Sequence, residues 1–304
     1  MNRHSTNATL IFISLATTLL FLVAGCGSSS TPAGKAIVIG SKPFTEGVLL
    51  SELAAQLIEG NTQLKVERKF NLGGTIVAFN ALKNGDLDLY PEYTGTGLVA
   101  ILKQPAVTDA DKAYGIVQKE FNSQFRIKWL KPLGFNNTYA MAVPEELAIK
   151  NNLKNTSDLA GIVDTLIFGA EQDFFGRADG YDGFTQAYGF KFKNVKQMEI
   201  GLKYKALANK EVNVINAFST DGLLITYKLR VLADDKKFFP PYYGAFLVRM
   251  STLEKYPELE AVLDKVAGKV TDIEMQKLNF EVDQEKKDPG AVVKVFLKEK
   301  GLIK

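Results

Sequence analysis

Short apolar runs alternate with stretches of helical periodicity along most of the chain, from residue 36 onward. Residues 36–40 are an uninterrupted apolar run that predicts a buried strand. The next stretch predicts a helix with Thr45 as its N-cap, Glu46 in its first turn and Gly60 at its end. The leucines that would share one buried face of this helix are Leu49, Leu53 and Leu57.

The same alternation of strand and helix signals continues beyond this helix. Residues 64–69 and 87–90 are predicted strands, and a glycine pair introduces a helix near Thr75. The strand at 87–90 would end before a turn at Pro91. This βαβα order predicts an α/β fold with mainly parallel strands, and two lobes with a ligand in the crevice between them fit it. Later elements of the same kind are strands at 138–143, 165–169 and 212–217, and a helix near Asp221.

The C-terminal part is predicted to be helical from its capping signals. Thr271 and Glu274 form a capping box, with Val270 and Met275 placed for a hydrophobic staple. The pair Asp288-Pro289 is typical of the start of a further helix, which would be the last of the chain.

The N-terminus resembles a lipoprotein signal. Arg3 forms a positive head, residues 8–25 carry no charge, and small residues precede Cys26. We expect residues 1–25 to be a signal peptide, Cys26 to be lipidated and 26–35 to be a flexible linker. The alternative is an uncleaved membrane anchor, for which an apolar run of 18 is marginal. Both interpretations place the bulk of the chain outside the cytoplasm.

Composition narrows the possible chemistry. Hydrophobic residues make up 46% of the 304 positions, and 37 basic and 34 acidic residues are interspersed, so no nucleic-acid partner is indicated. Cys26 is the only cysteine and His4 the only histidine, and His4 lies in the predicted signal. A mature chain without histidine excludes Ser-His-Asp and Cys-His catalysis and zinc sites of His and Cys. We therefore expect a binding protein with no cofactor and no metal, although hydrolysis by carboxylates alone stays open.

Aromatic and hydroxyl side chains gather where the strand at 87–90 ends. Tyr90, Tyr93 and Thr96 lie within seven residues, with Gly95 leaving the backbone open to approach. Such a cluster is either a ligand site or a packed strand–turn–helix joint with the tyrosines in the core.

Several motifs in order resemble the osmoprotectant-binding proteins of ABC importers, which bind glycine betaine, carnitine, choline and related solutes. They span residues 36 to about 250, nearly all of the mature chain. The resemblance implies a type 2 periplasmic-binding-protein fold, with two α/β lobes, a hinge of two crossovers and the ligand in the cleft. Lobe I would hold 36–137 and 242–304, and lobe II 138–241. The motifs are Gly40–Glu46, Asn71–Thr75, Tyr90–Thr96, Asn136–Ala140, Phe175–Tyr181, Val214–Gly222 and Phe238–Tyr243.

The same resemblance implies an aromatic cage. A trimethylammonium group is charged but has no N–H to donate, so its best partners are aromatic faces, each worth about 2 kcal/mol or more when desolvated. The alternative for each ring is core packing. The motif match gives Tyr242 for the fourth ring, and the register between Tyr242 and its neighbour Tyr243 stays open. The matching positions are Tyr93, Tyr139, Phe218 and Tyr242.

The anionic end of a betaine would be held by Arg177, with Lys42 and Thr96 as partners. The alternative for Arg177 is an ion pair with Asp179 or Asp182.

Two positions depart from the family pattern. Phe218 stands where tyrosine is common, so a hydroxyl is lost while the ring face remains. Asn137 stands where some relatives carry an acid, and a neutral amide should suit a zwitterion better than choline. Ile76 and Gly47 lie in motifs whose neighbours tune specificity, and their effect stays open.

The implied partners are a membrane permease with a cytoplasmic ATPase, the membrane itself through the lipid, and no second copy of the chain. Three alternatives stay open. The solute could be another betaine such as ergothioneine, the chain could be an enzyme on the same fold, or it could be an extracytoplasmic sensor or adhesin.

Overall fold

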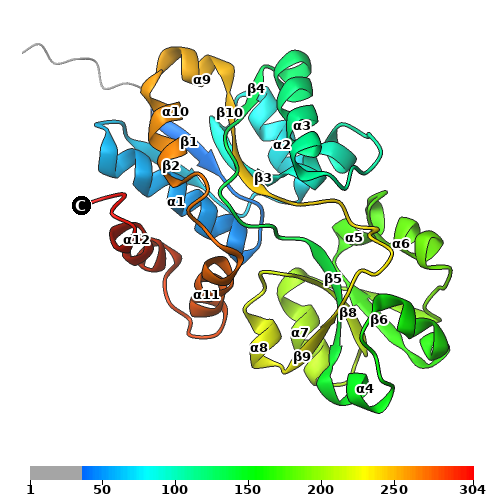
Figure 1. Ribbon diagram of the computed structural model, residues 1–304. Coiled ribbons are helices and arrows are strands. Elements are labelled where there is room, and N and C mark those ends of the chain that lie inside the picture. The colour runs from blue at the N-terminus through cyan, green and yellow to red at the C-terminus, as the bar shows by residue number, and fades with distance from the viewer. Residues whose placement is uncertain (1–35) are drawn as a thin grey trace, which may run out of the picture. The chain divides into compact units, whose positions relative to one another are not determined.

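The computed structural model describes residues 36–304, which form two five-stranded α/β sheets covered by helices (Figure 1). The predicted signal peptide, Cys26 and the linker lie outside the described residues. Within residues 36–304, no helix is both long enough and apolar enough to cross a membrane.

The first lobe is built on the sheet with strand order β2-β1-β3-β10-β4. Strand β1 is parallel to β2 and β3, whereas β10 is antiparallel to both β3 and β4. Its strands are β1 (Ile37–Gly40), β2 (Val66–Lys69), β3 (Leu89–Tyr93), β4 (Ile127–Trp129) and β10 (Gly244–Arg249). Its helices are α1 (Thr45–Asn61), α2 (Thr75–Asn84), α3 (Ala110–Phe125), α9 (Met250–Lys255), α10 (Glu258–Leu263), α11 (Asp272–Asp283) and α12 (Pro289–Glu299), with shorter turns at Thr96–Ile101 and Asp264–Val266.

The second lobe is built on the sheet with strand order β7-β6-β8-β5-β9. Strand β6 is parallel to β7 and β8, whereas β5 is antiparallel to β8 and β9. Its strands are β5 (Tyr139–Pro144), β6 (Ile167–Ala170), β7 (Asn194–Gln197), β8 (Val214–Phe218) and β9 (Leu229–Leu232). Its helices are α4 (Glu145–Lys150), α5 (Gln172–Gly176), α6 (Tyr181–Tyr188), α7 (Lys203–Ala208) and α8 (Leu223–Thr226), with short turns at Thr156–Gly161, Val163–Thr165 and Ile200–Leu202.

The chain passes between the two sheets twice, which is the two-crossover arrangement expected from the resemblance. The segment after β4 leads into β5, and the segment after β9 leads back into β10. The two segments are bonded to each other, since the Asn137 N–H donates to the Tyr242 carbonyl at 3.0 Å and the Tyr242 N–H donates to Asn136 Oδ1 at 2.7 Å. The predicted type 2 α/β fold is confirmed. The expectation of mainly parallel strands is confirmed as well, because four of the five strands in each mixed sheet run in the same direction and only β10 or β5 is antiparallel to its neighbours.

Helix α1 is the best-buried helix of the first lobe. The predicted face of Leu49, Leu53 and Leu57 is at most 1% exposed, because α1 packs on the sheet and also beneath α10, α11 and α12. Its predicted N-cap is wrong. The helix begins at Thr45 itself, with Phe44 in the N-cap position, and the Thr45 hydroxyl bonds to Asp283 instead.

Strand β3 continues past the point where the sequence predicts its end. Pro91 lies inside the strand opposite Phe246 of β10, so the predicted turn there is wrong. A proline has no N–H to donate to a neighbouring strand. Pro91 is tolerated because β1 pairs with β3 only at Leu89, which leaves the β1-facing edge of β3 unpaired at Pro91. The extension carries Tyr93 to the end of the strand.

The C-terminal capping signals are confirmed. Thr271 and Glu274 form a capping box at the start of α11, and the Asp288 carboxylate caps α12, whose first residue is Pro289. The staple residues Val270 and Met275 are both buried.

Candidate functional site

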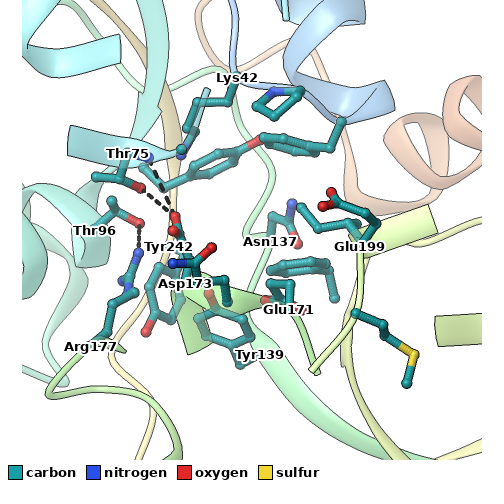
Figure 2. A pocket seen from close by; sticks show the side chains of 18 of the residues that line it. Lys42, Thr75, Thr96, Asn137, Tyr139, Glu171, Asp173, Arg177, Glu199 and Tyr242 are labelled. Atoms are coloured by element: carbon teal, nitrogen blue, oxygen red, sulfur yellow. Dashed lines mark hydrogen bonds between the residues drawn. The ribbon is translucent and has the colours of Figure 1, made fainter. Parts of the chain in front are cut away.

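A cavity of about 670 Å³ lies between the two lobes, with side chains from both of them in its wall (Figure 2). Lys42 and Thr75 approach it from the first lobe, and Tyr139 and Glu171 from the second. All eight residues predicted from the sequence to contact a ligand line this cavity. They are Lys42, Tyr93, Thr96, Asn137, Tyr139, Arg177, Phe218 and Tyr242.

The aromatic part of the wall centres on Tyr139. Its ring centroid lies 4.9 Å from that of Phe218 and 5.4 Å from that of Tyr242, the latter ring being nearly perpendicular at 86°. Strand pairing sets the first of these contacts, because Tyr139 of β5 is directly opposite Phe218 of β8. Rings that present faces and edges at these angles form a partial box rather than a stack.

Phe44 belongs to the same wall, although sequence reasoning did not assign it a role. Its ring lies 6.3 Å from Tyr93 and 6.5 Å from Phe218, so it bridges the rings of the two lobes. The signal was present, because Phe44 lies in the motif that includes Lys42.

The register at the end of the second crossover favours Tyr242. Tyr242 lines the cavity and is 2% exposed. Tyr243 is not in the cavity wall, and its backbone forms an isolated antiparallel β-bridge with Asn136. Gly95 makes room for the ring, since a Cβ built there would lie 2.6 Å from the Tyr242 ring and 2.9 Å from the Pro241 carbonyl.

Arg177 is held in an ion pair with Asp179, which is the predicted alternative to binding a solute carboxylate. Its Nε and Nη2 contact the two oxygens of Asp179 at 2.8 and 2.5 Å. Its Nη1 donates to Thr96 Oγ1 of the first lobe at 3.2 Å, and the Tyr242 hydroxyl donates to Asp179 at 2.6 Å. Burial and the nearby Asp179 raise the pKa of Tyr242 well above its usual range, so this phenol stays protonated.

Lys42 is buried rather than on the surface, at 7% exposure. Its ammonium contacts Glu92 Oε1 at 2.6 Å and lies 5.0 Å from the centroid of the Tyr93 ring. Lys42 and Arg177 are thus the two cations in the cavity wall, and each already has a carboxylate partner.

A third buried ion pair lies beside Phe218, and no local sequence signal marks it. Lys203 is fully buried, contacts Glu171 at 3.1 Å and lies 4.5 Å from the Phe218 ring centroid. Asn216 donates to the other Glu171 oxygen at 2.8 Å. One face of Phe218 therefore already holds a cation, which leaves the other face for the cavity.

The lobes also meet at the N-terminus of α2. Asp173 of the second lobe accepts from the Thr75 N–H and from the Thr75 hydroxyl, each at 3.3 Å (Figure 2). A carboxylate at this end of a helix is favoured by the helix dipole.

The cavity wall offers cation-binding faces and anion-binding groups, but no metal centre. Residues 36–304 contain no group of three or more His, Cys, Asp or Glu placed to hold a metal ion. Chemically, the site can enclose a small solute with a bulky cationic head against the rings and a polar end toward Arg177, Lys42 and Thr96.

Comparisons with known proteins identify the family to which the chain is similar. The family model described as the substrate-binding domain of ABC-type glycine betaine transport systems matches residues 35–299. The carnitine transport binding protein OpuCC of Listeria monocytogenes is 42% identical over 294 residues, covering 95% of this chain and 94% of that protein. The ergothioneine transport permease/ergothioneine binding protein EgtU of Helicobacter pylori is 39% identical, covering 88% of this chain and 48% of that protein. A crystal structure of a glycine betaine/carnitine/choline ABC transporter has a TM-score of 0.74 and 38% identity, covering 88% of this chain and 99% of that chain.

Proposed function

Because the chain belongs to the family of substrate-binding domains of ABC-type glycine betaine transport systems, we propose that it captures a small quaternary-ammonium solute and delivers it to a membrane permease. Glycine betaine, carnitine and choline are the solutes that the proposal includes. The chain itself would carry out no reaction, since transport energy comes from the ATPase of the importer.

The observation that supports this proposal best is the convergence of four rings from both lobes on one cavity. Tyr93 and Tyr242 come from the side of the first lobe, and Tyr139 and Phe218 from β5 and β8 of the second. A cation enclosed by such rings gains electrostatic attraction without needing a hydrogen bond, which suits a trimethylammonium head. Because the rings belong to different lobes, the enclosure is complete only when the lobes are closed on the solute.

The polar end of the solute would lie toward Arg177. Asp179 occupies one edge of the guanidinium, through Nε and Nη2, while Nη1 faces Thr96. We propose that a solute carboxylate binds at Nη1 and the Thr96 hydroxyl, with the Lys42 ammonium on the other side. Asn137 would favour such a zwitterion over choline, as a neutral amide in the cavity wall.

The proposed lobe boundaries follow the two crossovers. Residues 36–137 and 242–304 would form lobe I and residues 138–241 lobe II, which fits the strands of each sheet. The family places the chain outside the cytoplasm. We further propose that residues 1–25 are a signal peptide, that Cys26 carries the lipid anchor and that the protein acts as a monomer.

A larger betaine such as ergothioneine is the second candidate solute. It is favoured by the volume of the cavity, about 670 Å³, and by the 39% identical relative named for ergothioneine. Three further polar side chains that line the cavity would be available to contact the additional ring: Gln172, Gln197 and Glu199.

Calorimetric titration tests the proposal directly. The protein starting after Cys26 would be titrated with glycine betaine, carnitine, choline and ergothioneine. We expect micromolar or tighter binding of at least one of them, and recovery of the solute unchanged. Absence of heat with all four would contradict the proposal, and chemical conversion of a bound solute would favour an enzyme instead.

A further inference from the structure

Four acidic side chains are buried in the part of the chain that the structure describes, and three of them face a cation. Glu46 is the exception: it is 3% exposed, forms no ion pair within residues 36–304, and has only neutral hydrogen-bond donors around it. A buried charge without a counter-charge is costly, so its retention needs a reason. The three matched pairs are Glu92 with Lys42, Glu171 with Lys203 and Asp179 with Arg177.

The surroundings of Glu46 are built for its ionised form. Oε1 accepts from the Tyr93 hydroxyl at 2.7 Å and from Asn137 Nδ2 at 2.6 Å. Oε2 accepts from the Thr220 hydroxyl at 2.6 Å and from Asn279 Nδ2 at 2.8 Å. Four donors match the four lone pairs of a carboxylate, whereas a protonated acid would have fewer acceptor sites than donors. The donors come from β3, the first crossover, the second lobe and α11, so Glu46 ties both lobes to the hinge.

No other charged group near Glu46 neutralises it. A smaller cavity of about 270 Å³, which shares Phe44 and Asn137 with the main one, is lined by Glu46 together with Asp221, Asp283, Tyr204 and Lys286. Two of these are acids, and the Lys286 ammonium donates to the carbonyl oxygen of Asp283. On the other side of Tyr93, the Lys42 ammonium is matched by Glu92.

Tyr93 connects Glu46 to the solute cavity. Its ring lies in the cavity wall, while its hydroxyl, at the far end of the ring, donates to Glu46, which is not in that wall. A carboxylate that accepts this hydrogen bond makes the phenol more electron-rich, which strengthens the attraction of its face for a cation.

We propose that Glu46 is a positioning residue of the solute site: it holds Tyr93 and Asn137 in place, and its negative charge is balanced by the cationic head of the bound solute. This inference rests on the proposed function. The counter-charge of the quaternary ammonium is then a residue outside the cavity wall. Tight binding therefore requires that the solute head be charged, and the right shape alone is not sufficient.

Glu46→Gln is the variant that tests it, because it removes the charge and keeps the size. The surroundings can accommodate the amide. Asn137 Oδ1 and Asn279 Oδ1 are both buried and without a hydrogen-bond partner, so either side chain can turn to accept from the new NH₂ group. Thr220→Val is the matched control, because it removes one hydrogen bond to Glu46 and leaves the charge. Thermal unfolding of each variant would establish that it is folded.

The measurement compares glycine betaine with tert-butylacetate, which has the same shape but a carbon in place of the charged nitrogen. We expect Glu46→Gln to weaken glycine betaine binding by about tenfold, and tert-butylacetate binding, measured by competition, by less than about twofold. Thr220→Val should change both affinities by the same factor. Equal loss of both ligands in Glu46→Gln, or no loss of glycine betaine affinity, would overturn the proposal.

A second readout does not depend on the affinity of the isostere. Burial raises the pKa of Glu46 above its ordinary value, although its four hydrogen bonds oppose this shift. A cation near Glu46 lowers the pKa again, so glycine betaine binding to the wild-type protein should release protons at mildly acidic pH. Calorimetry in buffers of different ionisation enthalpy measures this release, which should disappear in Glu46→Gln; an unchanged release would contradict the role of Glu46. If the wild-type protein binds no quaternary-ammonium solute at all, the proposed function itself fails. If it binds such a solute and Glu46→Gln binds it equally well, only the role of Glu46 fails.

Discussion

Asp173 and Thr75 join the two lobes across the mouth of the cavity, the Asp173 carboxylate accepting from both the N–H and the hydroxyl of Thr75. Both contacts are 3.3 Å long, and Thr75 is the first residue of α2. The carboxylate therefore gains from the helix dipole only when the lobes are closed. The contact involves no solute, so it favours closure whatever the cavity holds.

Replacing Asp173 with alanine should therefore weaken all solutes by a similar factor. We expect a loss of about three- to tenfold for glycine betaine and choline alike, which is the range for an ordinary hydrogen bond, because both contacts to the carboxylate are long. Calorimetry gives the affinities, and small-angle scattering gives the fraction of closed protein at saturation. Asp182→Ala removes the same charge from an exposed position of α6, and it should leave the affinities and the fraction of closed protein unchanged. A loss confined to one solute would instead mean that Asp173 contacts the solute itself.

Removal of the Tyr139 ring should abolish tight binding, because Tyr139 contacts two of the three other predicted cage rings. Tyr139→Ala is expected to weaken binding more than tenfold, given about 2 kcal/mol or more for a desolvated cation–π contact. Tyr181→Ala is the control: it also removes a buried ring of the second lobe, but one outside the cavity wall. Both variants should lose stability, and only the first should lose affinity by titration at a temperature where both are folded. If affinity falls equally in Tyr139→Ala and Tyr181→Ala, the Tyr139 ring contributes to binding only through the packing of the lobe.

The order of the family motifs along the chain was sufficient to predict which rings meet. Tyr139 and Phe218 are far apart in sequence, and the resemblance assigned both to one cage. Only the structure shows that β5 and β8 are neighbours and that these two residues lie directly opposite each other. The two-lobed fold and the α11 and α12 caps could also be predicted, because capping depends on residues within one turn.

Features set by long-range contacts could not be predicted. Thr45 has the composition of an N-cap, but its hydroxyl bonds to Asp283, which lies 238 positions later in the chain. Pro91 is an ordinary turn signal, and only the limited pairing of β1 with β3 allows it inside a strand. Lys203 is fully buried because Glu171 and the Phe218 ring lie beside it, and lysines are normally exposed.

Arg177→Ala separates carboxylate recognition from scaffolding. If Nη1 binds the solute carboxylate, glycine betaine should lose more than tenfold in affinity, while choline, which has no carboxylate, should lose far less. The ion pair with Asp179 complicates the comparison, because removing Arg177 leaves a buried carboxylate that the Tyr242 hydroxyl also contacts. Arg177→Ala/Asp179→Asn is therefore the control that neutralises both partners. Equal losses for the two solutes in both variants would show that Arg177 serves to position Asp179 and Tyr242.

Gly95 is required for the position of Tyr242. An alanine Cβ there would lie 2.6 Å from the Tyr242 ring and 2.9 Å from the Pro241 carbonyl, so the ring or the crossover must shift. Gly95→Ala should lower solute affinity about tenfold or more with the protein still folded. Gly115→Ala is the control, since a Cβ in α3 meets nothing within 4 Å there and should stabilise the helix by about 0.5–1 kcal/mol. An unaltered affinity in Gly95→Ala would mean that Tyr242 is not needed in its present position.

The α11 capping box should make stability fall in acid. The Glu274 carboxylate accepts from the Lys300 ammonium at 2.6 Å and from the Thr271 N–H at 2.9 Å, and these contacts lower the Glu274 pKa below its ordinary value of 4.5. A lowered folded-state pKa contributes stability above pH 4.5, and that contribution is lost as the pH falls through the folded-state value. Glu274→Gln should therefore cost about 0.5–1 kcal/mol near pH 7 and progressively less toward pH 3, as urea unfolding at several pH values would measure. Glu299→Gln, which removes the same charge from an exposed position of α12, provides the comparison. A difference between wild type and Glu274→Gln that stays constant with pH would show that the cap depends on the shape of the side chain and not on its charge.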